Sequence, residues 1–111
     1  MNNCLFCKII SGGIPSKKVY EDELVFAFYD IDPKAPVHVL IVPKAHCDSV
    51  LEADAMTVAA LFEAAKKIAK ELGVAKTGFR LVLNTGEDGG QSVGHLHMHL
   101  LGARALAWPP G

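Results

Sequence analysis

The spacing of apolar and polar residues predicts one long amphipathic helix between about Asp54 and Leu72. Apolar side chains recur there at intervals of three and four residues, which places them in one stripe along a helix. Three lysines near its carboxyl end suit the helix dipole, and Gly73 supplies a stop. The predicted apolar stripe consists of Val58, Leu61, Phe62, Ala65, Ile68, Ala69 and Leu72.

Shorter apolar runs predict five strands, and CLFCKII predicts a short helix over residues 4–10. The segments 30–36 and 85–90 are predicted loops, the first because its two prolines lack a backbone donor. Short turns join the strands, without repeated helices between them. This order favours an α+β fold with a mostly antiparallel sheet. The predicted strands cover residues 17–21, 24–29, 37–42, 79–84 and 95–101.

The composition narrows the class of protein. A length of 111 residues suits a single domain spanning residues 1–111. A formal net charge of -1 argues against a protein that coats a nucleic-acid polymer, but it is compatible with a small anionic ligand. The apolar content of 50% excludes disorder, and it leaves apolar surface for a subunit interface.

The sequence also predicts where the protein resides. No stretch approaches the roughly 18 uninterrupted apolar residues of a membrane span. The amino-terminal MNNCLFCKIISGG lacks the basic start and long apolar run of a signal peptide. Three cysteines, an odd number, do not suit a disulfide framework. We therefore expect a cytoplasmic protein with no membrane partner.

Histidines are concentrated at His38, at His46 and in the run His95, His97 and His99. On a strand these last three would share one face, where buried imidazoles are costly unless each has a partner. Cα atoms two apart on a strand lie ~7 Å from each other and those four apart ~13 Å, so one metal ion could bind two of the three but hardly all. Separate roles as nucleophile, orienting group and phosphate contact fit better. A solvated histidine face is the alternative.

The segment before this run, residues 84–92, is rich in glycine and small polar residues. Glycines let backbone N–H groups approach an anion closely, and Gln91 and Ser92 add side-chain donors. Such a loop is by itself more often a plain turn. Its position directly before the histidines is what favours phosphate chemistry, although neither a P-loop nor a dinucleotide fingerprint is present.

The run HLHMHLL over residues 95–101 resembles the signature of the histidine triad superfamily, in which three histidines alternate with apolar residues. Further segments resemble its Hint branch of nucleoside phosphoramidate hydrolases: CLFCKII, IPSKKVYEDE, AFYDIDPKAPVHVLIVPKAH, LNTGEDGGQSVGHLHMHLLGAR and WPPG. The resemblance covers nearly the whole chain. It implies the fold of that superfamily and a homodimer in which two copies join their five-stranded sheets into one.

The resemblance implies a role for each histidine near the reaction. His97 would attack the α-phosphorus and form a transient nucleotidyl-imidazole. The backbone carbonyl of His95 would hold the other ring nitrogen of His97, and His99 would contact phosphate oxygens. Ser92 would lie near the leaving group, and His38 would complete the buried cluster.

The resemblance also implies the substrate contacts. Asp30 would bind the ribose hydroxyls, with Ile31 beside the base. Without the resemblance, Asp30 is as well explained as a turn residue before Pro33. The phosphate end would be lined by Asn84, Gly90, Gln91 and Ser92.

Two residues bear on substrate choice. In the Hint pattern the tail that carries Trp108 crosses to the pocket of the partner subunit. Gly94 departs from the family, which usually has Phe or Tyr directly before the triad, so packing beside the pocket and leaving-group preference are in doubt.

A second site is implied at the amino terminus. Cys4 and Cys7 have a Cys-x-x-Cys spacing, which alone is ambiguous between zinc binding, redox use and two small buried thiols. Several triad proteins close a structural zinc site with this pair and two histidines, at the positions of His46 and His95. Cys47 is expected to lie outside this set. The implied reaction itself requires no metal.

The expected activity is hydrolysis of purine nucleoside phosphoramidates, including adenylylated lysine, with the nucleoside monophosphate as product. The fragile-histidine branch, which cleaves dinucleoside polyphosphates, usually has Gln where this chain has His99. A nucleotide-binding regulator with incidental catalysis is the alternative from outside the enzymes.

Overall fold

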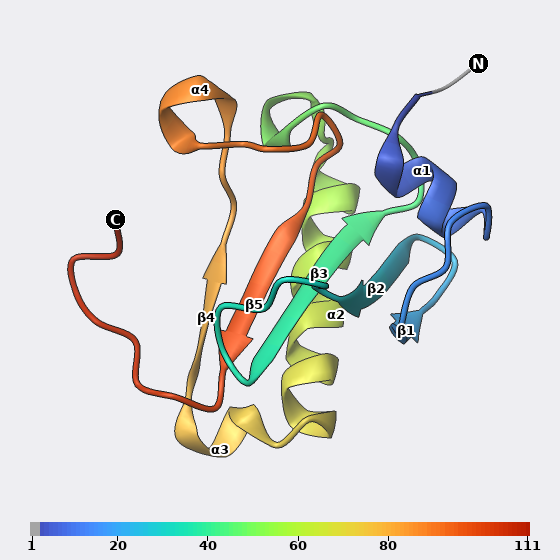
Figure 1. Ribbon diagram of the computed structural model, residues 1–111. Helices are drawn as coiled ribbons and strands as arrows, with labels where there is room; N and C mark the ends of the chain where they lie inside the picture. Colours follow the sequence, from blue (N-terminus) through green and yellow to red (C-terminus); the bar gives the residue numbers. More distant parts are fainter. Residues whose placement is uncertain (1–2) are drawn as a thin grey trace.

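Five antiparallel strands form one sheet in the order β1-β2-β3-β5-β4 (Figure 1). The computed structural model describes residues 3–111, so the first two residues of the amino-terminal stretch discussed above lie outside it. The architecture confirms the predicted α+β class. The strands are β1 (Lys18–Glu21), β2 (Val25–Tyr29), β3 (Val37–Pro43), β4 (Phe79–Val82) and β5 (Met98–Gly102).

Helices cover both faces of this sheet unequally. The α-helices are α1 (Leu5–Ile10), α2 (Ala55–Glu71), α3 (Val74–Thr77) and α4 (Gly86–Gly89), and η1 (Val50–Glu52) is a 3-10 turn. α2 lies along one face, while α1 packs at the other near β2 and β3 (Figure 1). Within residues 3–111, no helix combines the length and apolar character that a bilayer crossing requires.

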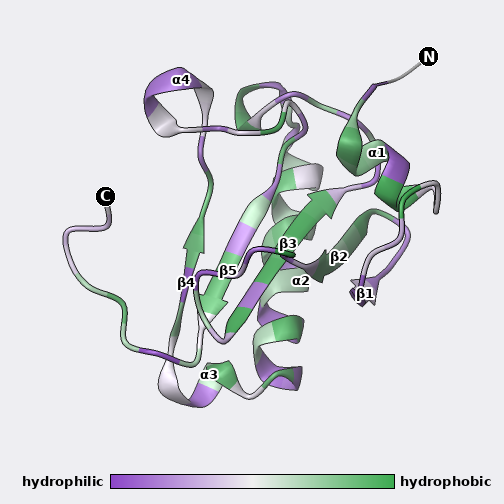
Figure 2. Cartoon of the chain, in the orientation of Figure 1, coloured by the Kyte–Doolittle hydropathy of each residue, from purple (hydrophilic) through white to green (hydrophobic). Residues whose placement is uncertain are grey.

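Side-chain alternation along β2 and β3 creates a core on each face. β3 is hydrophobic along most of its length (Figure 2). Val39 and Ile41 face α2, whereas Leu40 and Val42 pack with Phe6 of α1. Successive residues of a strand point to opposite faces, so these two cores are separated by the sheet itself. The side chains near α1 therefore wall a space distinct from the main core.

The long helix forms where its periodicity predicts. The Asp54 carboxylate accepts a hydrogen bond from the Thr57 N–H at 2.8 Å, which caps the start of α2. The helix ends before Gly73, whose φ of 80° suits glycine. The apolar stripe is not buried throughout, since Phe62 is 42% exposed, and Ala64, which lies outside the predicted stripe, is buried. The stripe that packs on the sheet is thus narrower than the apolar stripe of the sequence.

The predicted strand over residues 95–101 is wrong at its start. β5 begins only at Met98, opposite Ile41 of β3, and His95 and His97 lie in irregular backbone before it. The Leu96 N–H donates to the Cys47 carbonyl at 2.8 Å, so this stretch bonds to the loop after β3 instead of to a strand. Strand alternation therefore describes His99 alone, and β4, which pairs with β5, ends at Val82 and not at residue 84.

Other local differences are small. The predicted loop over residues 85–90 contains the single helical turn α4, and η1 and α3 were not predicted. Pro43, expected to close the third strand, is its last residue and pairs opposite Val25.

Gly102, in β5, is required by close packing against α3. A Cβ added to this residue would lie 2.8 Å from Val74 Cγ1 and 3.0 Å from Val74 Cβ. We expect Gly102→Ala to lower the free energy of unfolding by about 1–3 kcal/mol through overpacking. Urea denaturation measures this. Gly94→Ala is the control, because a Cβ at Gly94 meets no atom within 4 Å. The explanation fails if Gly102→Ala is as stable as that control, or if adding Val74→Ala does not recover part of the loss.

Candidate active site and metal centre

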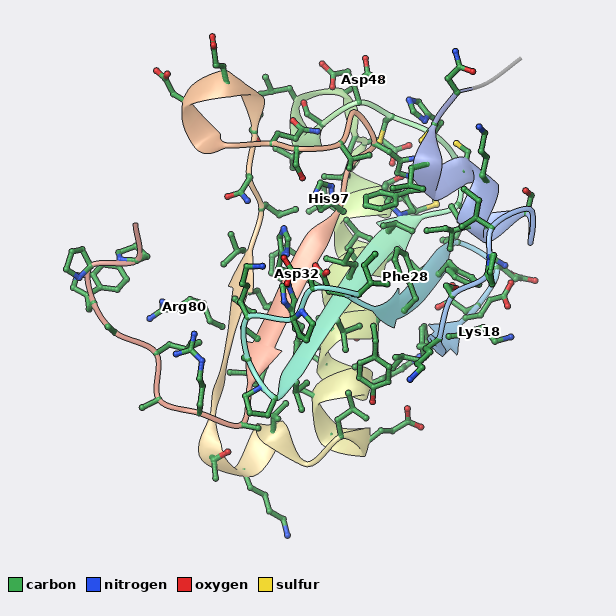
Figure 3. The ribbon with its side chains drawn as sticks, in the orientation of Figure 1. Lys18, Phe28, Asp32, Asp48, Arg80 and His97 are labelled. Atoms are coloured by element: carbon green, nitrogen blue, oxygen red, sulfur yellow. The ribbon has the colours of Figure 1, made fainter. Side chains whose placement is uncertain are left out.

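An enclosed space of about 280 Å³, here called the inner cavity, lies between α1, the sheet and the loop before β5. His97 stands at the amino-terminal end of β5, and Phe28 projects from β2 (Figure 3). The wall is mainly apolar, and its polar groups include those of Ser92, His97, His99 and Asp30. The remaining residues that line it are Leu5, Phe6, Ile9, Ile14, Pro15, Ser16, Phe28, Tyr29, Ile31, Leu40 and Val93.

The His97 ring is oriented by its own backbone neighbourhood. His97 Nδ1 lies 2.9 Å from the carbonyl oxygen of His95, and the ring is 4% exposed. A carbonyl only accepts, so Nδ1 carries the proton and Nε2 keeps its lone pair. The Phe6 ring stands edge-on to His97 with centroids 5.0 Å apart. A buried imidazole with one free lone pair is the form that can act as a nucleophile at neutral pH.

A chain of hydrogen bonds fixes His38 and His99. The Lys34 N–H donates to His38 Nδ1 at 3.0 Å, which leaves the proton of the neutral His38 ring on Nε2. His38 Nε2 lies 2.9 Å from His99 Nδ1, which must then accept. The proton of His99 is therefore on Nε2. We call this chain, from the Lys34 amide through His38 to His99, the histidine relay.

The relay includes two of three residues that could otherwise hold a metal ion, Asp30, His38 and His99. Ligand atoms of Asp30, His38 and His99 all lie within 4.8 Å of one another. Yet His38 Nε2 carries a proton while Nδ1 accepts from Lys34, so neither nitrogen of that neutral ring has a lone pair free for an ion. The group is a hydrogen-bonded relay.

Burial keeps the relay histidines neutral. Desolvation lowers the pKa of His38, and it lowers the pKa of His99 to about 4, with help from the neighbouring His97 and His38. Below its unfolded pKa of ~6.5, the unfolded chain binds a proton at His99 that the folded chain does not. The stability that His99 contributes is therefore present above about pH 6.5 and is lost as the pH falls toward 4.

The variant His99→Gln tests this pH dependence, because a glutamine can still accept from His38 but does not titrate. We expect the free energy of unfolding of the wild type to fall by roughly 2–3 kcal/mol more than that of the variant between pH 7 and pH 4. Urea denaturation at a series of pH values measures the difference. Parallel curves for the two proteins would show that His99 is not the acid-labile group.

The four residues implied as a metal site converge in space. Cys4 Sγ lies 3.3 Å from His95 Nδ1, and Cys7 Sγ lies 3.5 Å from the same atom. His46 Nδ1 is 3.3 Å from Cys7 Sγ and 3.1 Å from His95 Nδ1. All four ligand atoms lie within 4.8 Å of one another. We call Cys4, Cys7, His46 and His95 the Cys₂His₂ cluster.

The second ring nitrogen of each histidine in the cluster has its own acceptor. His46 Nε2 lies 2.9 Å from the Asp48 carboxylate, and His95 Nε2 lies 2.9 Å from the Pro43 carbonyl. These contacts place the protons on Nε2 and turn the Nδ1 lone pairs toward the thiols, the arrangement that metal-binding histidines adopt. Burial opposes ionisation of Cys4, but hydrogen bonding, first of all from the Cys7 backbone N–H, lowers the pKa of its thiol overall. The donor set suits a divalent metal ion.

Asp30 and Ile31 lie where the inner cavity opens into a wider hollow of about 690 Å³ that also reaches His38. Ile31 is 98% exposed there, which leaves its side chain available to a ligand. Asp30 also has the turn role that its sequence suggests, because its Oδ1 accepts from the Asp32 N–H at 2.8 Å. Its Oδ2 lies 3.5 Å from His38 Nε2.

Of the other residues predicted to contact the substrate, only one lines the inner cavity. Ser92 lines the inner cavity, but Asn84, Gly90 and Gln91 do not. The Gln91 amide is engaged in the loop, donating to the carbonyls of Asp48 and Val93 and accepting from the Gly86 N–H. Trp108 is 80% exposed, with the Arg80 guanidinium 5.9 Å from its ring centroid. Within this chain it is remote from the cavity wall.

The sequence analysis assigned Cys4 and Cys7 to the metal site, but it assigned no residue of this segment to the inner cavity. Leu5, Phe6 and Ile9 wall the inner cavity, and the two cluster thiols flank Phe6 on the same helix. The sequence did contain one signal of this second contact surface. Apolar residues occupy adjacent positions of the short helix, so their side chains cannot all face the same surface. α1 thus links the cavity to the Cys₂His₂ cluster.

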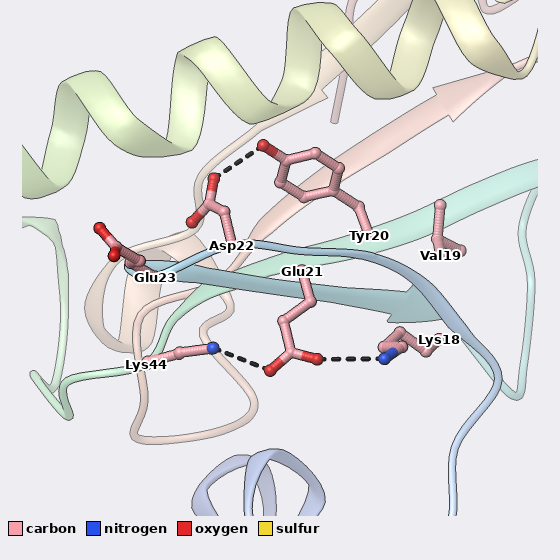
Figure 4. A pocket seen from close by; sticks show the side chains of 7 residues that line it. All are labelled: Lys18, Val19, Tyr20, Glu21, Asp22, Glu23 and Lys44. Carbon is pink, nitrogen blue, oxygen red and sulfur yellow. Dashed lines mark hydrogen bonds and ion pairs between the residues drawn. The ribbon is translucent and has the colours of Figure 1, made fainter.

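Another surface hollow, beside the turn between β1 and β2, shows no sign of a ligand site (Figure 4). Glu21 lies 2.8 Å from Lys44 and 3.1 Å from Lys18, and the Tyr20 hydroxyl donates to Asp22 at 2.7 Å. Lys18, Glu21 and Lys44 are therefore paired with one another, and Asp22 is bonded to Tyr20.

The chain matches one family in a family model, in the sequences of relatives and in solved structures. A family model described as HIT domain matches residues 11–106. An uncharacterized HIT-like protein of Synechococcus elongatus is 51% identical over 110 residues, 96% of each chain. Purine nucleoside phosphoramidase of Escherichia coli K12 is 47% identical over 105 residues, 92% of this chain and 88% of that one. A HIT family hydrolase structure from Legionella pneumophila superimposes with a TM-score of 0.95 at 46% identity, covering 98% of this chain and 100% of that chain.

Proposed function

This chain belongs to the HIT domain family and is a nucleotide hydrolase of that type, and on this premise we propose that it cleaves the P–N bond of purine nucleoside phosphoramidates. The observation that carries the proposal is His97, buried against the inner cavity with its Nε2 lone pair free. Support for the substrate class comes from the similarity to a purine nucleoside phosphoramidase. Adenylylated lysine is within this class.

The proposed reaction has two displacements. In the first, His97 Nε2 attacks the α-phosphorus, a bond from phosphorus to Nε2 forms, and the phosphorus–amine bond breaks. The departing amine keeps the electron pair and takes a proton from the hydroxyl of Ser92, which lines the inner cavity; the proton lost by the attacking water in the second displacement would restore that hydroxyl. In the second, water attacks phosphorus, the bond to His97 breaks, and the nucleoside monophosphate leaves.

Neutral donors are proposed to hold the phosphate. His99 carries its proton on Nε2 and borders the cavity, so it can donate to a phosphate oxygen without a formal charge. The positive charge that develops on the His97 ring as Nε2 bonds to phosphorus would be stabilised by the His95 carbonyl at Nδ1. Asp30 and Ile31 are proposed to bind the ribose and the base in the wider hollow. Asn84, Gly90 and Gln91 would shape the phosphate loop, and Trp108 would act from a partner subunit.

We further propose that the Cys₂His₂ cluster holds a structural zinc ion. In a tetrahedral zinc site with Zn–S ≈ 2.3 Å and Zn–N ≈ 2.0–2.1 Å, ligand atoms stand roughly 3.3–3.8 Å apart. The contacts between cluster atoms, from 3.1 to 3.5 Å, are close to this range. Four protein ligands leave no open position, so zinc would stabilise α1 and the loop at His95 and take no part in the reaction.

We also propose that the protein forms a homodimer and resides in the cytoplasm. β4 pairs with β5 on one side, and at the start of this edge strand Phe79 is 37% exposed, which suits pairing with a second copy in a homodimer. A single domain in the cytoplasm fits the chain length and the three cysteines, an odd number that does not suit a disulfide framework.

A fluorogenic adenosine phosphoramidate tests the proposed reaction, with diadenosine triphosphate and adenosine monophosphate measured alongside. We expect turnover of the phosphoramidate at a far higher kcat/KM than of the dinucleotide. Preferential turnover of diadenosine triphosphate would instead favour the fragile-histidine branch. Binding of the monophosphate without turnover of either substrate would favour a nucleotide-binding regulator.

A further inference from the structure

Arg104 joins the end of the sheet to the loop between β2 and β3. Its Nε and Nη2 both donate to the carbonyl oxygen of Lys34, at 3.0 and 2.9 Å, and its Nη1 donates to the Ala105 carbonyl at 2.9 Å. In the view of Figure 1, this loop runs in front of β5. The planar fork of a guanidinium fixes direction as well as distance. Arg104 therefore holds the peptide plane between Lys34 and Ala35 in a defined orientation.

The same residue of the loop starts the histidine relay. The Lys34 N–H donates to His38 Nδ1 at 3.0 Å, and His38 Nε2 lies 2.9 Å from His99 Nδ1. Each link determines the next, because a neutral imidazole carries one proton and accepts at its other nitrogen. A single backbone amide thus decides which nitrogen of His99 presents a proton to the cavity.

Two further contacts in the loop constrain that amide or the His38 ring only weakly. The Lys34 side chain pairs with the Asp32 carboxylate at 2.7 Å, but both side chains are largely exposed, at 63% and 85%. Exposed pairs of this kind contribute about 0–1 kcal/mol. Asp30 Oδ2 favours the same His38 tautomer, but at 3.5 Å from Nε2 it is beyond the length of a good hydrogen bond, so its influence is weaker than that of the Lys34 amide.

We propose that Arg104 is a positioning residue for the reaction. By holding the Lys34 carbonyl, it limits rotation of the backbone at Lys34, keeps the N–H of the same residue aligned on His38 Nδ1, and so sets the proton of His99 on Nε2, toward the phosphate. The effect on turnover rests on the proposed function, whereas the effect on the tautomers does not. Arg104 itself is exposed, so its replacement is compatible with folding.

Long-range ¹H–¹⁵N spectra of protein labelled at histidine report the tautomer of each ring directly. We expect single Nε2–H forms of His38 and His99 in the wild type at pH 7.5, and a mixture of tautomers in Arg104→Gln. The variant should also lose about tenfold in kcat with little change in KM, because the donor to the phosphate is misplaced. Arg104→Lys, which keeps the charge but loses the fork, should lie between the two.

Arg80→Gln is the matched control for the tautomers. Arg80 also grips a backbone carbonyl, that of Ala107 at 2.9 Å, but it does not touch the loop. In Arg80→Gln, the spectra of His38 and His99 should match those of the wild type. Wild-type tautomers in Arg104→Gln would overturn the proposal, and so would mixed tautomers with an unchanged kcat. If the wild type has no phosphoramidase activity, the proposed function fails, yet the tautomers still decide whether Arg104 sets the relay.

Discussion

The variant His97→Gln is expected to lose at least roughly 1,000-fold in kcat for an adenosine phosphoramidate, because it removes the nucleophile and with it the covalent route. Glutamine has a size and polarity near those of histidine, so the buried position beside Phe6 stays filled. Steady-state kinetics with the fluorogenic substrate measures the loss. Circular dichroism and the melting temperature establish that the variant is folded.

Acid-sensitive labelling separates this expectation from a general loss of binding. Wild-type protein, quenched during turnover, should carry one nucleotidyl group that is stable to alkali and labile to acid, and His97→Gln should carry none. His99→Gln is the matched control, because it changes the neighbouring ring, with a centroid 5.1 Å away, and leaves His97 intact. It should still be labelled. Retention of more than about a tenth of wild-type kcat by His97→Gln would contradict a nucleophilic role.

The second large effect is expected at the Cys₂His₂ cluster. Wild-type protein, made without a histidine tag, should contain close to one equivalent of zinc, and Cys7→Ser should contain almost none. Bound metal stabilises the folded state by mass action, by about 4 kcal/mol when free zinc exceeds its Kd 1,000-fold. We expect a loss of that order in the variant and in wild type treated with a chelator. Elemental analysis and urea denaturation measure the two quantities.

The chain offers a matched control for this prediction. Cys47 is also half-buried and directly follows His46, but its thiol is outside the cluster. Cys47→Ser should keep its zinc, whereas His46→Asn, on a different segment from α1, should lose it as Cys7→Ser does. Turnover should fall in both metal-free variants, because the His95 carbonyl that orients His97 belongs to a cluster residue. Equal metal content in Cys7→Ser and the wild type would refute the site.

Part of the candidate site followed from local sequence, because it depends on residue type and short spacing. The histidine run and the glycine-rich loop before it could be recognised in this way, whereas the bond from the His97 ring to the His95 carbonyl was implied by the family resemblance. The relay did not follow, because its first link joins a backbone amide to a ring, and no residue type encodes that contact. Arg104 was missed for the same reason, since its partner is a carbonyl 70 residues away.

The sequence by itself determined the class of fold, the long helix and the concentration of histidines before β5. These features rest on side-chain periodicity and on turn residues, which act within a few positions. The tertiary structure decided where β5 begins, since the Leu96 amide bonds to Cys47 instead of a strand partner. It also brought Cys4 and His95 together across 91 positions. Such contacts depend on strand register and on competition for backbone hydrogen bonds, which only the folded chain resolves.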